Sequence, residues 1–147
     1  MSQSEHAVRL FGEGMNCAQA VLSAFASELG LDLPTALRLG TALGGGMGGS
    51  GRTCGALTGG MLVLGLKAGG TGKAREKTYE LVRELVSRFE ARHTSAQCRD
   101  LIGPIDTPET LQAAREKNIF RTVCPALVRD AAEIVQELIA RQPASGH

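Results

Sequence analysis

A glycine-rich segment at residues 44–70 constrains the fold of this chain more than any other feature. Residues 44–51 favour a tight loop, because glycine tolerates positive φ and lets backbones approach closely. Thr53 is a good N-cap residue and predicts a helix that begins at Cys54. That helix is apolar on nearly every side over residues 56–66, which is typical of a buried helix. Its four glycines each cost about 1 kcal/mol relative to alanine, which indicates close packing by neighbouring helices.

The rest of the chain has helical periodicity and almost no strand signal. Cap residues and apolar faces predict helices that begin near residues 4, 17, 33, 73, 95, 107 and 124. We therefore expect an all-α fold, a compact bundle of six or seven helices around the buried glycine-rich helix. The length predicts one domain over residues 1–147, with a core at about residues 5–140.

Composition argues against several classes of partner. The net charge is +1 and aromatic residues make up only 3% of the chain, so we expect no nucleic-acid binding. The longest apolar run, residues 56–66, is too short and too rich in glycine to span a membrane. Residues 1–13 carry charges throughout and contain no apolar stretch of a secretory signal. Four cysteines without an export signal indicate a reducing compartment, and we expect a cytoplasmic protein.

The four cysteines share a position in the predicted helices. Each falls in the first turn or at the cap of a helix, where the positive end of the helix dipole favours thiolate over thiol. Their spacing excludes a local C-x-x-C motif or zinc ribbon but not a site assembled from several helices. We expect the sulfurs to converge near the start of the glycine-rich helix. The cysteines are Cys17, Cys54, Cys98 and Cys124.

Two neighbouring side chains are candidates for a role at such a site. Arg52 lies beside Cys54 and would stabilise its anion, so we expect Cys54 to be the most reactive thiol. His93 is close in sequence to Cys98 and could serve as its base or as a metal ligand. A histidine near a helix C-terminus is more often structural. The cysteines themselves could also be inert, because cysteine often behaves as a small buried apolar residue.

The order of these residues resembles the C_GCAxxG_C_C family of small prokaryotic proteins, classed as redox-active from their cysteines. The resemblance covers about residues 5–138. It implies a single domain of this length with redox-active cysteines, and it implies no particular substrate. The residues that carry it are Cys17, Cys54, Gly55, Ala56, Gly59, Cys98 and Cys124.

Three interpretations of function stay open. The first is thiol/disulfide electron transfer by one or two cysteine pairs with an unknown redox partner, which would make the protein an oxidoreductase. The second is a metal or iron–sulfur centre held by the same four thiolates. The third is a structural or partner-binding helical module. The apolar, glycine-rich surface also suggests a homodimer.

Overall fold

Capping side chains set the first helices, α1 (Gln3–Gly12), α2 (Cys17–Ala26) and α3 (Leu33–Thr41). The N-cap side chains of Ser2, Asn16 and Asp32 each accept a hydrogen bond from a backbone N–H in the first turn. A short 3-10 turn follows α2, and Gly30 ends it with a left-handed backbone, φ 80°. The sequence prediction of these three helix starts is confirmed.

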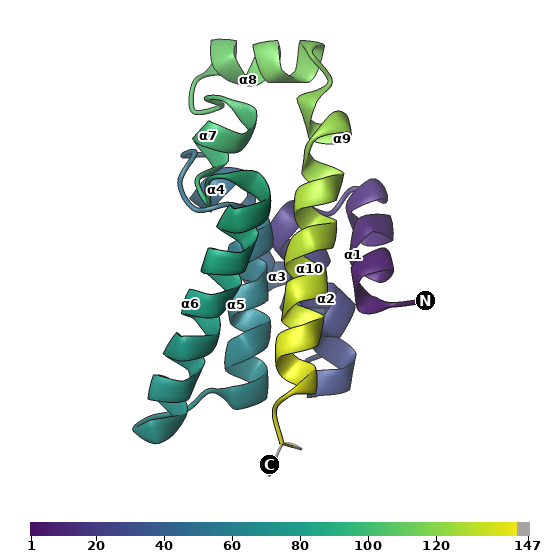
Figure 1. Cartoon of the computed structure of the whole chain (residues 1–147). Coiled ribbons are helices and arrows are strands. Elements are labelled where there is room, and N and C mark those ends of the chain that lie inside the picture. Colours follow the sequence, from purple (N-terminus) through teal and green to yellow (C-terminus); the bar gives the residue numbers. More distant parts are fainter. Residues whose placement is uncertain (144–147) are drawn as a thin grey trace.

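The computed structural model describes residues 1–143, which form an all-α fold (Figure 1). Within them, the only β pairing is an isolated bridge between Thr53 and Gln97. None of the described helices is long and apolar enough to cross a membrane. The remaining helices are α4 (Gly44–Met47), α5 (Gly55–Ala68), α6 (Lys73–His93), α7 (Cys98–Ile102), α8 (Pro108–Glu116), α9 (Ile119–Thr122) and α10 (Cys124–Ala140).

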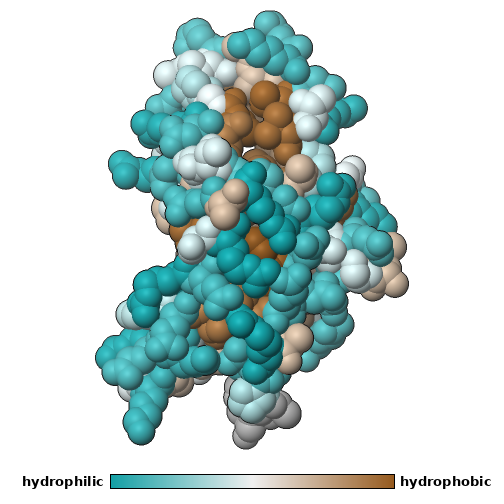
Figure 2. Space-filling model, viewed as in Figure 1, coloured by the Kyte–Doolittle hydropathy of each residue, from teal (hydrophilic) through white to brown (hydrophobic). Residues whose placement is uncertain are grey.

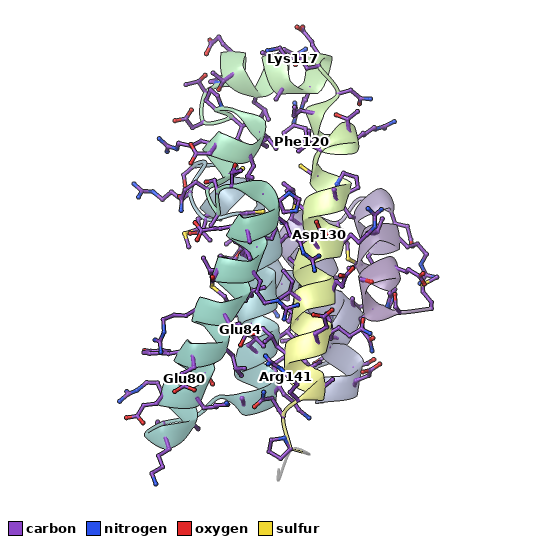
Figure 3. All side chains as sticks on the ribbon, in the orientation of Figure 1. Glu80, Glu84, Lys117, Phe120, Asp130 and Arg141 are labelled. Carbon is purple, nitrogen blue, oxygen red and sulfur yellow. The ribbon has the colours of Figure 1, made fainter. Side chains whose placement is uncertain are left out.

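The long helices α6 and α10 run side by side, and α5 packs against both (Figure 1). Charged side chains bridge the two helices. Arg141 donates to Glu84 at 2.9 Å, and Arg92 lies 3.3 Å from Asp130. In Figure 3, Arg141 lies at the lower end of α10, and Asp130 lies above both Arg141 and Glu84. At the other end, α7, α8 and α9 form an arch.

Helix α2 is more deeply buried than α5. All residues from 20 to 26 on α2 are buried, and the helix contacts α1, α3, α5 and α10. Helix α5 is buried over its first two turns, whereas Met61, Leu62 and Leu66 are partly exposed. The expectation that residues 56–66 form the most buried segment is therefore wrong, because the second half of α5 has one side open.

The glycine loop coils in the left-handed sense. Residues 45–49 all have positive φ, including Met47 at 67°. Four of these five residues are glycines, and only glycine adopts this left-handed backbone without steric cost. This left-handed turn contains α4, which the sequence did not predict. Residues 1–143 contain eight helices of five residues or more, α5 among them, beside the four-residue turns α4 and α9.

Candidate functional site

Each cysteine lies at the start of a helix, as the sequence predicted to within two residues. Cys17, Cys98 and Cys124 are the first residues of α2, α7 and α10. Cys54 is the N-cap residue of α5. The starts of four helices from distant parts of the chain therefore bring one sulfur each to a common region.

All four cysteines line one cavity of about 430 Å³. It lies at the end of the bundle where α7, α8 and α9 form the arch. In Figure 2 a hollow with apolar surface is visible beneath α8, between α7 and α9. The other lining residues are Phe11, Gly14, Asn16, Gly45, Gly46, Gly55, Leu101, Ile102, Leu111, Arg115, Phe120 and Leu127.

Backbone hydrogen bonds hold the segments of Cys54 and Cys98 together. The Cys54 N–H donates to the Ala96 carbonyl oxygen at 2.8 Å, and the Cys98 N–H donates to the Arg52 carbonyl oxygen at 2.7 Å. Both bonds flank the bridge between Thr53 and Gln97. Since these bonds use main-chain atoms, they fix the two cysteines whatever the state of their sulfurs.

Glycines allow the cysteine-bearing segments to approach one another. A Cβ on Gly46 would lie 2.7 Å from the Cys98 Cβ, and one on Gly55 would lie 3.2 Å from the Cys17 Cβ. A Cβ on Gly59 would lie 2.6 Å from the Ala18 carbonyl oxygen. Gly55 and Gly59 are one turn apart on α5, so both face the start of α2. The glycines of the C-G-A-x-x-G motif thus set the distance between Cys17 and Cys54.

Hydrogen bonding with the Cys124 side chain, together with burial and the charges of the three other sulfurs, raises the pKa of Cys17 well above its ordinary value. The same interaction lowers the pKa of Cys124, and burial opposes that shift. A donated hydrogen bond favours the charged form of its acceptor. Cys124 is therefore the cysteine whose thiolate forms most readily.

Burial dominates at the other two cysteines. It raises the pKa of Cys54 to about 12, although the N–H groups of Ala56 and Leu57 act in the opposite direction. Burial and the charge of Cys124 raise the pKa of Cys98 to about 11. The expectation that Cys54 carries the most reactive thiol is wrong, because the cost of desolvating its anion exceeds the help from the helix start.

The two charged candidates from the sequence lie elsewhere. Arg52 is exposed and is not among the residues that line the cavity. His93 is also outside the lining, and its Nε2 lies 2.7 Å from an oxygen of Asp130. Its ring packs against Phe89, with centroids 4.7 Å apart. His93 therefore joins α6 to α10, the structural role that the sequence left open.

The sulfurs are all free thiols. Within residues 1–143, no three His, Cys, Asp or Glu side chains are grouped closely enough, as they stand, to hold a metal ion. The mutual effects on pKa nevertheless show that Cys17 senses each of the other three sulfurs. Four thiols therefore line one cavity, and Cys17 and Cys124 affect each other's pKa in opposite directions.

Sequence reasoning missed the walls of this cavity. Phe11, Phe120 and Leu111 come from α1, α9 and α8, and in the sequence they read only as apolar positions of amphipathic helices. Arg115 was not singled out in the sequence. No local signal distinguishes these residues, because the arch that gathers them depends on tertiary packing.

The fold and the cavity define an all-α protein with four thiols at helix starts. The sequence matches the family model described as "Putative redox-active protein (C_GCAxxG_C_C)" over residues 15–138. The chain belongs to this family, as the sequence resemblance predicted. No curated protein and no solved structure matches the chain.

Proposed function

We propose that the protein transfers electrons by thiol/disulfide exchange, with Cys124 as the attacking thiolate and Cys17 as its partner. The observation that supports this is that both side chains line one cavity, where interaction with Cys17 lowers the pKa of Cys124. Exchange requires a thiolate and a second thiol within bonding reach. The family description as a redox-active protein agrees with such a role.

The exchange has two steps. The Cys124 thiolate attacks one sulfur of an acceptor disulfide, forming a mixed disulfide and releasing the other half as a thiolate. Cys17 then loses its proton to a released thiolate and attacks the Cys124 sulfur. The acceptor leaves as two reduced halves, and a disulfide joins Cys17 to Cys124. Two electrons pass from the protein to the acceptor.

Cys98 and Cys54 form the second pair in this proposal. The charge of Cys124 raises the pKa of Cys98, and the charge of Cys98 raises the pKa of Cys54. The effects of charge therefore link the second pair to Cys124. Its high pKa values keep it protonated at neutral pH, so it would react after the first pair.

Oxidation of the reduced protein in small steps tests the proposal. Free thiols are trapped by alkylation at each step, and peptide mass analysis then locates the first disulfide. We expect it between Cys17 and Cys124, and we expect Cys54→Ala to leave it unchanged. Cys17→Ala and Cys124→Ala should each prevent it. An early disulfide elsewhere, with Cys17 and Cys124 still open to alkylation, contradicts the proposal.

A soft metal or iron–sulfur centre is the second candidate, because all four sulfurs face one cavity. Four thiolates suit either kind of centre, but sulfurs would have to move to about 2.3 Å from a zinc ion. Elemental analysis and a thiol count on anaerobically purified protein discriminate the two. Stoichiometric zinc or iron with four masked thiols would favour the metal centre over exchange.

Three coarser expectations remain predictions: a single domain over residues 1–147, a cytoplasmic location and a homodimer. Light scattering after size-exclusion chromatography measures the molar mass directly and so tests for the homodimer. Leu33 and Leu39 on α3, 49% and 51% exposed, are the apolar side chains to substitute if a dimer is found.

A further inference from the structure

The depth of the sulfurs limits which oxidants can reach them. Cys54, Cys98 and Cys124 are only 3%, 7% and 3% exposed. Exchange needs the attacking sulfur, the attacked sulfur and the leaving sulfur to meet directly. A disulfide held in the surface of another folded protein cannot enter this cavity without opening it. A small molecule can.

The size and walls of the cavity suit a small apolar molecule. Its volume of about 430 Å³ falls in the range of small-molecule sites. Apart from the sulfurs, most side chains that line it are apolar or aromatic: Phe11, Leu101, Ile102, Leu111, Phe120 and Leu127. Phe120 projects from α9 beside the opening of the arch (Figure 3). Such walls favour a flat or branched hydrocarbon body over a strongly hydrated one.

The lining of the cavity includes one positively charged side chain, that of Arg115. Arg115 is the only Asp, Glu, Lys, Arg or His side chain among the cavity-lining residues that the structure describes. It is exposed, in the last turn of α8, and it forms no ion pair with any residue between 1 and 143. An arginine at the rim of an apolar cavity favours a ligand with a carboxylate or similar anion at one end.

We propose that the acceptor is a small disulfide with an apolar, preferably aromatic, body and an anionic group that faces Arg115. This inference rests on the proposed function, because it names the substrate class of that same exchange. The body lies among the apolar walls, and the disulfide lies against Cys124. Attack by the Cys124 thiolate then releases one half as a thiolate, and Cys17 resolves the mixed disulfide and frees the other half.

Three probes separate size from charge in stopped-flow reactions with the reduced protein. Dithiobis(nitrobenzoate) is an aromatic disulfide with carboxylates, dithiodipyridine is aromatic without them, and methyl methanethiosulfonate is too small to need the cavity. Leu111→Trp fills the cavity, Arg115→Gln removes the cation, and Leu39→Trp adds the same bulk on the exposed face of α3.

We expect Leu111→Trp to slow both aromatic probes about tenfold or more while methyl methanethiosulfonate reacts within about twofold of the original rate. Arg115→Gln should slow dithiobis(nitrobenzoate) about two- to fivefold, the range of an exposed ion pair, and leave dithiodipyridine unchanged. Leu39→Trp should change none of the rates. If each probe reacts at the same rate with every variant as with the original protein, the inference is overturned.

A second measurement needs no variant that could misfold. Nitrobenzoate, which cannot oxidise a thiol, should protect Cys124 from alkylation in a saturable manner, and less so in Arg115→Gln. No protection, together with a Cys17–Cys124 disulfide formed by methyl methanethiosulfonate, overturns the substrate class and leaves the proposed function standing. Protection without that disulfide under any oxidant overturns both the exchange and the disulfide substrate.

Discussion

Replacing Gly59 with alanine should destabilise the protein, although alanine is the better helix former. The added Cβ would lie 2.6 Å from the Ala18 carbonyl oxygen and 3.0 Å from the Ala18 Cα. Both are main-chain atoms, so no side-chain rotation relieves the contact. Helix α5 must move away from α2, which loosens the approach that places Cys17 beside the start of α5.

Gly65 provides a matched control in the same helix. A Cβ at Gly65 meets nothing within 4 Å. Each substitution gains about 1 kcal/mol of helix propensity, so this gain cancels when the two variants are compared. The difference that remains is the cost of overpacking, about 1–3 kcal/mol. We therefore expect Gly65→Ala to be more stable than the original protein and Gly59→Ala to be less stable, or at best unchanged.

Urea unfolding of the fully reduced proteins, followed by far-ultraviolet circular dichroism, measures both free energies of unfolding. The slopes with urea should agree among the three proteins, so that midpoints report stability alone. If Gly59→Ala proves as stable as Gly65→Ala, then Gly59 is not needed for the close contact of α5 with α2, and the reasoning fails.

Three further predictions concern single side chains. Cys17→Ala should raise the pKa of Cys124, because the interaction with Cys17 that lowers this pKa is lost. Alkylation rates against pH report the change. The free energy of unfolding should fall as pH rises above about 9, because the Cys54 thiol ionises near pH 9 in the unfolded chain but only near 12 in the folded chain. The contribution of Cys54 to this decline is at most about 1.4 kcal/mol per pH unit. Cys54→Ala should make the decline shallower in thermal unfolding measured from pH 8 to 11. His93→Gln should cost about 1 kcal/mol through its bond to Asp130 and leave the alkylation of Cys124 unchanged, as urea unfolding and thiol kinetics would show.

The parts of the fold that the sequence predicts well are those with local causes. Asn16, Asp32 and Thr107 cap helices in the structure because each can accept a hydrogen bond from its own first turn. Four cysteines at such starts also indicated that the thiols would gather. All four cysteines do line one cavity, and its role as a shared functional site stays a prediction.

The parts that could not be predicted depend on burial and tertiary packing. The prediction that Cys54 is the most reactive thiol was wrong because the dipole at a helix start is visible in the sequence, whereas the burial of Cys54 is not. The left-handed turn was missed for a similar reason: Met47 adopts φ 67° only because its glycine neighbours and the hydrogen bonds around them impose it. Arg115 lines the cavity because α8 spans the arch between α7 and α9, an arrangement that tertiary packing sets.

The cavity favours one thiolate at a time, and this gives the proposed exchange an order of reaction. An anion on Cys124 raises the pKa of Cys98, Cys54 and Cys17 through its charge or its hydrogen bond. When Cys124 enters a disulfide with Cys17, that negative charge is gone, and the charge term that held Cys98 protonated disappears with it. In the proposed exchange, oxidation of the first pair would therefore lower the pKa of Cys98 and prepare it to react next. Electrons would then leave two at a time, first from Cys17 and Cys124 and then from Cys54 and Cys98.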